Sequence, residues 1–192
     1  MRRLKIFLDT NVLMRLDGLK DDPELEDFKN RLEISRAKLS VTHIQVDEKH
    51  LDELKNFQDK LRKVLGSLRK KGIHIQLEPT KEMVAGLVRV GLVKLGYDEM
   101  HKFDDELRKE IDKCEKARGK TKELLNIARD TNIAVSALGH DYFITTDYCL
   151  FVSWVNALKK HRVHLERFKI PKIIYAHRST EAVARQILAL VC

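Results

Sequence analysis

Short apolar runs alternate with longer amphipathic segments along most of this 192-residue chain. The run 4–8 is mostly apolar, which is typical of a strand buried on both faces of a parallel sheet. The segments between such runs carry apolar residues every three or four positions, which is typical of amphipathic helices. Strands that alternate with helices form right-handed crossovers around a parallel sheet. We therefore predict an α/β fold, a three-layer sandwich with a mainly parallel central sheet.

The same patterns predict the extent of each element. We expect strands at 4–8, 38–46, 73–77, 141–145 and 172–176, and helices at 12–16, 24–35, 49–69, 80–95, 124–138, 148–160 and 179–191. The chain 1–192 is predicted to be a single domain, with a helical elaboration at about 49–120 and a C-terminal strand–helix extension at about 170–192. Within the elaboration, charges crowd into 97–120, so we expect a solvated helix or a mobile arm there.

Acidic residues follow three of the predicted strands. Asp9 comes after the first strand, Asp47 and Glu48 after the second, and Asp147 after 141–145. The carboxyl ends of parallel strands share one edge of the sheet, so these acids are expected to converge. Two plainer roles stay open: Asp9 could cap the next helix, and Glu48 could be an exposed acid in a first helical turn.

A fourth acid, Asp130, lies within an apolar helical segment and shares a helix face with Ile127 and Ala134. A carboxylate on a buried stripe requires a partner, and a metal ion, Arg129 or a hydroxyl would each serve. Clustered carboxylates repel one another, which raises their pKa values or leads them to bind a divalent cation. Oxygen ligands without Cys or His favour Mg²⁺ or Mn²⁺ over zinc.

The net charge of +8 makes a polyanionic partner such as nucleic acid plausible. Each basic run taken alone is a solvated helix end, but together the runs could form a surface for phosphates. These predicted RNA-binding residues are Arg69, Lys70, Lys71, Arg118, Lys120, Lys122, Lys159, Lys160 and Arg162. Tyr97, Trp154 and Phe168 could stack on bases, although aromatic residues in an apolar stripe more often belong to the core.

The three cysteines are widely spaced and odd in number, so we expect no disulfide framework and a reducing compartment. The start of the chain has no signal-peptide pattern, and the most apolar later stretch, 83–95, is charged and too short to span a bilayer. We expect a cytoplasmic protein without a membrane partner.

Three segments, Leu8–Leu13, Val41–Glu48, and Asp130–Ala134 with Phe143–Asp147, resemble a PIN-domain nuclease in order and spacing. In this resemblance the acidic quartet is Asp9, Glu48, Asp130 and Asp147, which the resemblance implies are both catalytic and metal-binding. Asn11 and Thr145, together with Thr10, match supporting polar positions. Neighbouring strand residues point to opposite faces, so either Asp47 or Glu48 faces the site, and the motif alignment selects Glu48.

The resemblance implies an Mg²⁺- or Mn²⁺-dependent endoribonuclease that hydrolyses RNA phosphodiester bonds with a metal-activated water. RNA would be its partner, with an antitoxin, an RNA-processing protein or a second copy as further candidates. The middle segment is longer than in the compact toxins of the family. Two alternatives stay open: a PIN-fold RNA-binding or assembly module that does not cleave, acting in an RNA-processing complex, and a flap-type DNA nuclease.

Overall fold

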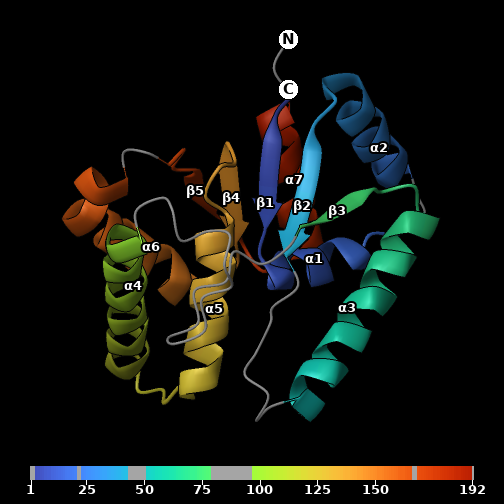
Figure 1. The fold of residues 1–192 in the computed structure, drawn as a ribbon. Helices are drawn as coiled ribbons and strands as arrows, with labels where there is room; N and C mark the ends of the chain where they lie inside the picture. Colours follow the sequence, from blue (N-terminus) through green and yellow to red (C-terminus); the bar gives the residue numbers. More distant parts are fainter. Residues whose placement is uncertain (1–2, 21–22, 43–50, 79–96, 166–167, 192) are drawn as a thin grey trace.

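A computed structural model of the chain describes residues 3–20, 23–42, 51–78, 97–165 and 168–191. Five parallel strands form one sheet in the order β3-β2-β1-β4-β5, with helices on both faces (Figure 1). The predicted α/β three-layer sandwich is therefore confirmed. Among the described residues, no helix combines the length and the apolar content that a membrane crossing requires.

Most element boundaries lie within two residues of the predicted ones. The strands are β1 (Lys5–Leu8), β2 (Lys38–Thr42), β3 (Ile75–Glu78), β4 (Tyr142–Thr145) and β5 (Lys172–Tyr175). The helices are α1 (Thr10–Asp17), α2 (Pro23–Ser35), α3 (Leu51–Lys70), α4 (Tyr97–Ala117), α5 (Leu124–Ser136), α6 (Tyr148–His161), the short 3₁₀ turn η2 (Arg162–Leu165) and α7 (Thr180–Val191).

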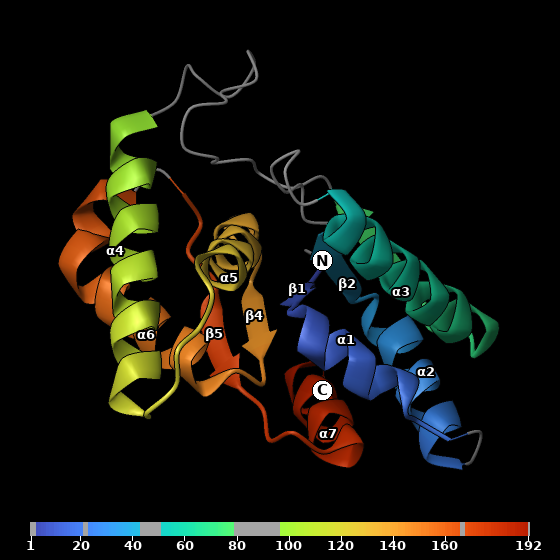
Figure 2. The same ribbon diagram turned by 90° about the horizontal axis from the view of Figure 1, so that it is seen from below.

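The central strands are apolar on both faces because each face is covered by helices. Ile6 and Leu8 of β1 belong to a core shared with α1, α2, α3 and α7. Phe7 points the other way, into a second core formed with α4, α5 and α6. The two helical layers lie on opposite sides of the sheet in both ribbon views (Figure 2). The period of two along β1 thus explains why Ile6, Phe7 and Leu8 are all apolar.

The order of the strands reverses direction between β1 and β4. From β1 the chain builds outward through β2 to β3, then returns to place β4 and β5 on the other side of β1. The Asp9 N–H donates to the Ile144 carbonyl at 2.9 Å, which extends the pairing of β1 with β4 to their carboxyl ends. Ligands of open α/β sheets bind at such a reversal, outside the carboxyl ends of the strands.

The charged segment 97–120 is not the solvated helix or mobile arm that was predicted. Its residues form α4, which buries Phe103, Leu107 and Ile111 completely and packs against α6. These three residues are four positions apart and share one helix face. Charged residues surround this stripe, and three of them, Asp104, Glu110 and Glu115, are themselves buried. The abundance of charges concealed a narrow apolar stripe.

The middle and the end of the chain both contribute strands and helices to the layered fold. β3 forms one edge of the sheet, and α3 and α4 cover opposite faces. β5 forms the other edge, and α7 contributes Val183 and Ile187 to the first core. The predicted strand end at 43–46, the acids Asp47 and Glu48, and the predicted helix 80–95 lie outside the described residues.

Candidate metal centre

Asp9 directly follows β1 and Asp147 lies two residues after β4, so the reversal of strand order places them at the same edge of the sheet. The Thr145 hydroxyl connects them. It donates a hydrogen bond to Oδ2 of Asp9 at 2.7 Å and accepts one from the Asp147 backbone N–H at 3.0 Å. Thr145 was predicted to support the first acid, and its hydroxyl fixes how the two acidic strand ends lie relative to each other.

Asp9 is buried, with 2% of its surface exposed. It occupies the N-cap position of α1, but its side chain makes no capping hydrogen bond. Burial raises the pKa of Asp9 from 3.8 to about 6, the Thr145 hydrogen bond opposes this rise, and the charge of Asp147 adds to it. The backbone amides of Asn11 and Thr10 lower the pKa by smaller amounts. A buried acid with a raised pKa is typical of a site prepared for a cation.

Asp147 uses its two carboxylate oxygens differently. Oδ1 accepts the backbone N–H of Leu150 at 3.0 Å and so caps α6. Oδ2 lies 3.3 Å from the Nζ of Lys122. The cap fixes the side chain through one oxygen and leaves the other directed toward the site.

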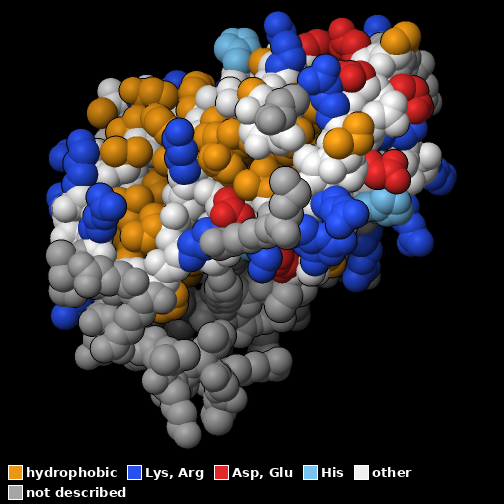
Figure 3. All heavy atoms as spheres, turned by 90° about the horizontal axis from the view of Figure 1, so that it is seen from above, with side chains coloured by type: hydrophobic (Ala, Val, Ile, Leu, Met, Phe, Trp, Pro, Cys, Tyr) orange, Lys and Arg blue, Asp and Glu red, His pale blue; other side chains and the backbone are white. Residues whose placement is uncertain are grey.

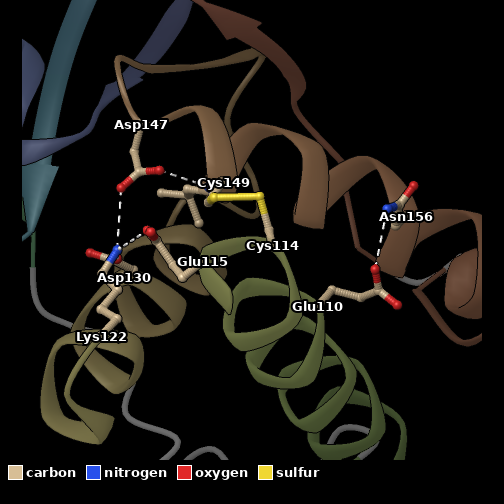
Figure 4. Close-up of a disulfide and its surroundings, with 9 residues drawn as sticks. Glu110, Cys114, Glu115, Lys122, Asp130, Asp147, Cys149 and Asn156 are labelled. Carbon is tan, nitrogen blue, oxygen red and sulfur yellow. Dashed lines mark hydrogen bonds and ion pairs between the residues drawn. A yellow bond between two sulfur atoms is a disulfide. The ribbon is translucent and has the colours of Figure 1, made fainter. Parts of the chain in front are cut away.

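Asp130 of α5 is partnered by Lys122, from the loop before the helix (Figure 4). Lys122 Nζ lies 2.5 Å from Oδ2 of Asp130, 3.3 Å from Oδ2 of Asp147 and 3.3 Å from Oε1 of Glu115. A single ammonium group is therefore held by three carboxylates from three different elements. The chain supplies a monovalent cation to its own acidic cluster, which we call the Lys122 cluster.

The electrostatics of the Lys122 cluster follow from its burial. Burial raises the pKa of Asp130 to about 7, Lys122 opposes the rise, and the charges of Asp9 and Asp147 add to it. Burial disfavours the charge of Lys122, but the Asp130 and Asp147 carboxylates outweigh this effect and hold the pKa of the ammonium above its ordinary value. Asp9 and Asp130 thus influence each other electrostatically although they are far apart in the sequence.

One set of three potential ligand atoms is compact. Atoms of Glu115, Asp147 and Cys149 lie within 4.8 Å of one another, and in the part of the chain that the structure describes this is the one such group; Asp9 and Asp130 are not members of it. The Cys149 sulfur is bonded to Cys114, with the Cα atoms 5.5 Å apart, so the group offers two carboxylates (Figure 4). The expectation of a chain without disulfides was wrong for this pair.

Glu115 was not among the predicted site residues, although the sequence contained a signal for it. It is 8% exposed and continues the spacing of four that Leu107 and Ile111 define along α4. An acid on a buried apolar stripe requires a partner, as Asp130 does. The prediction of a solvated helix or a mobile arm for 97–120 did not consider that one of its acids could be buried.

Three of the predicted RNA-binding residues pair with other groups of the chain, although Lys160 is itself exposed. Lys122 lies in the acidic cluster, Lys160 pairs with Glu106 and Glu110, and Lys71 donates to the carbonyls of Asp17 and Leu19. The side chains of the other six predicted residues are exposed: Arg69, Lys70, Arg118, Lys120, Lys159 and Arg162. On the face opposite the site, basic side chains mix with acidic ones toward α2 and with hydrophobic ones toward α6 (Figure 3).

The remaining predicted site residues are placed as follows. Thr10 is 7% exposed and begins α1, and Asn11 is exposed in the same first turn. Glu48, the predicted second acid, and its neighbour Asp47 lie outside the described residues. The described site therefore consists of Asp9, Asp130 and Asp147 with Lys122 and Glu115.

In comparisons with known proteins, no family model matches the chain, and no curated protein or solved structure matches it significantly.

Proposed function

We propose that this chain is a divalent-metal-dependent ribonuclease of the PIN type. The observation that carries the proposal is the Lys122 ammonium, held by the carboxylates of Glu115, Asp130 and Asp147. A cluster that binds a cation through carboxylate oxygens has the donor set that Mg²⁺ and Mn²⁺ require. Its position beside Asp9, at the reversal of strand order, is where ligands of such sheets bind.

Each residue has a distinct part in this proposal. Asp9, Asp130 and Asp147 would hold the metal, with Glu48 as the predicted fourth acid. Thr145 orients the Asp9 carboxylate through its hydroxyl, and the cap on α6 orients Asp147. A divalent ion in such a site lowers the pKa of water and neutralises charge on a scissile phosphate. The net charge of +8 supports a polyanionic substrate, and a cytoplasmic setting remains a prediction.

The Lys122 cluster also favours a second candidate function. A cluster partly neutralised by its own ammonium is stable without a metal, as expected of a PIN-fold module that binds RNA or assembles a particle without cleaving. The two functions differ in whether Mn²⁺ displaces Lys122. Metal binding measured directly therefore separates them better than a search for activity.

The test is isothermal titration of the full-length protein with Mn²⁺ at pH 7.5, followed by RNA cleavage with Mg²⁺ or Mn²⁺. Removing a supporting residue of a metal site commonly weakens affinity about 10- to 100-fold, so loss of a ligand should weaken it at least as much. We expect this loss in Asp130→Asn and Asp147→Asn. Asp112→Asn, in an exposed ion pair with Lys116, is the matched control and should bind as wild type does.

The outcomes discriminate among the candidates. Cleavage of RNA but not of DNA of the same sequence, lost in both site variants, supports the ribonuclease. Cleavage of branched DNA in preference to RNA supports the flap-type nuclease. RNA binding that persists in EDTA, with neither Mn²⁺ binding nor cleavage, overturns the nuclease proposal in favour of the assembly module.

A further inference from the structure

Two exposed tyrosines lie side by side next to the candidate metal centre. Tyr148 begins α6 directly after Asp147, and Tyr175 ends β5. Their rings are 6.0 Å apart between centroids and nearly perpendicular, and Phe151 lies 5.8 Å from Tyr175. The side chains are 45% and 39% exposed, and they are the exposed aromatic residues in the part of the chain that the structure describes.

These are not the aromatic residues that the sequence suggested for base stacking. Trp154 is fully buried and Phe168 packs against the second core, so both are structural. The side chain of Tyr97 lies outside the described part of the chain. Tyr148 and Tyr175 belong to neither core, so packing does not explain why two aromatic rings occupy this edge of the sheet.

The side chain of Arg118 lies against the tyrosine pair and adds a positive charge to it. The Arg118 guanidinium carbon lies 5.4 Å from the centre of the Tyr148 ring, within the range of a cation–π contact. Arg118 follows α4 and is exposed. Its planar guanidinium can stack on a nucleobase and can also bind a phosphate, which a lysine ammonium does only as a point charge.

The surrounding charge favours a polyanion over a protein. The segments 116–122 and 172–180, which carry Arg118 and Tyr175, contain lysines and arginines and no acidic residue, whereas Tyr148 directly follows Asp147. Arg178 is exposed, and its Nε donates to the Thr146 carbonyl at 3.3 Å, which holds this basic residue beside Asp147. The acidic Lys122 cluster would repel phosphates. The lysines and arginines of 116–122 and 172–180 offset that repulsion on the side of the cluster where the two tyrosines lie.

We propose that Arg118, Tyr148 and Tyr175 form a stacking platform that binds unpaired bases of a single-stranded nucleic acid and directs the strand across the Lys122 cluster. The proposal rests on the proposed function and deepens it by naming the residues that select unpaired strands. Bases in a duplex are stacked on each other and cannot reach such a platform, whereas splayed bases can.

The test is fluorescence polarisation with a labelled 12-nucleotide RNA that lacks internal pairing, in EDTA so that cleavage is absent. Loss of one base–aromatic contact typically weakens binding at least about fivefold. We expect this loss in Tyr148→Leu and Tyr175→Leu, which keep bulk but remove the π face, and in Arg118→Ala. The variants Tyr148→Phe and Tyr175→Phe should bind within about twofold of wild type, because stacking uses the ring.

Arg62→Ala, which removes an exposed arginine from α3 that is not among the predicted RNA-binding residues, is the control for the loss of general charge and should change affinity little. Duplex RNA of the same sequence should compete poorly. Wild-type affinity in the leucine variants, or the absence of RNA binding by the wild type, overturns the platform. If light scattering instead shows a dimer that dissociates in the leucine variants while RNA affinity is unchanged, the tyrosines form a protein interface and the proposal fails.

The two proposals can fail separately. Platform-dependent binding in EDTA without any metal-dependent cleavage leaves the platform standing and removes the nuclease. Metal-dependent cleavage with a wild-type KM in both leucine variants leaves the nuclease standing and removes the platform.

Discussion

Under the proposed function Lys122 occupies the position that a divalent cation would take, so the two should compete. In Lys122→Met we expect Mn²⁺ to bind at least about tenfold more tightly, because the metal no longer displaces an ammonium from three carboxylates. The metal-free variant should unfold more easily, by about 3 kcal/mol, because buried carboxylates lose their partner. Titration calorimetry and urea unfolding in EDTA measure the two effects.

Lys120→Met removes an exposed lysine two residues away and should leave both quantities near wild type. A Lys122→Met protein that binds Mn²⁺ more weakly than wild type would contradict the competition and make Lys122 a supporting residue instead.

Asp9 makes the stability of the metal-free protein depend on pH. Its pKa is about 6 in the fold and 3.8 in the unfolded chain, so the folded state binds the proton more tightly. The stability from this group is fully present below about pH 4 and is lost as the pH rises through 6. Between pH 5 and 7.5 the free energy of unfolding should fall by on the order of 1 kcal/mol from Asp9, and Asp130 acts in the same direction.

Urea unfolding in EDTA at both pH values measures this slope. Asp9→Asn keeps an acceptor for the Thr145 hydroxyl but cannot ionise, so its slope should be shallower than that of the wild type. Asp112→Asn, altered at an exposed position, should keep the wild-type slope. An Asp9→Asn protein with the full slope would show that Asp9 is ionised across this range.

At the scale of elements, α4 offers the clearest test of the fold. Leu107 of α4 is completely buried in the second core, so Leu107→Ala should destabilise the protein by about 2–5 kcal/mol. Lys109→Ala, at an exposed position of the same helix, should change stability by less than about 0.5 kcal/mol. Equal urea midpoints for the two variants would mean that α4 is the solvated helix that its composition suggests.

Elements with a clear apolar period were predicted well from the sequence, and elements with a weak one were not. β1 and α6 were predicted within one residue because their apolar residues have a clear period and polar residues end them. For α4, the stripe of Phe103, Leu107 and Ile111 is one residue wide and is surrounded by charges. Period alone could not show that this narrow stripe meets another helix, since that depends on α6, which is more than thirty residues further along the chain.

At the scale of the whole molecule, convergence of the acids could be predicted, but their partner could not. Asp9 and Asp147 follow parallel strands, so their shared edge required no knowledge of strand order. That Lys122 turns inward among the acids depends on where the loop before α5 lies against α4. The disulfide likewise joins residues whose separation of 35 positions says nothing about their proximity.

The bond between Cys114 and Cys149 closes a covalent ring of chain that contains Glu115, Lys122, Asp130, Thr145 and Asp147. The loop after α4 is exposed at Gly119 and Lys120, inside this ring. A specific protease site introduced there should yield one band of full mass on a non-reducing gel after cleavage, and two fragments once a reductant is added. Separation without reductant would show that the ring is open. In the closed ring, the cut chain should keep every member of the Lys122 cluster on one covalently joined molecule.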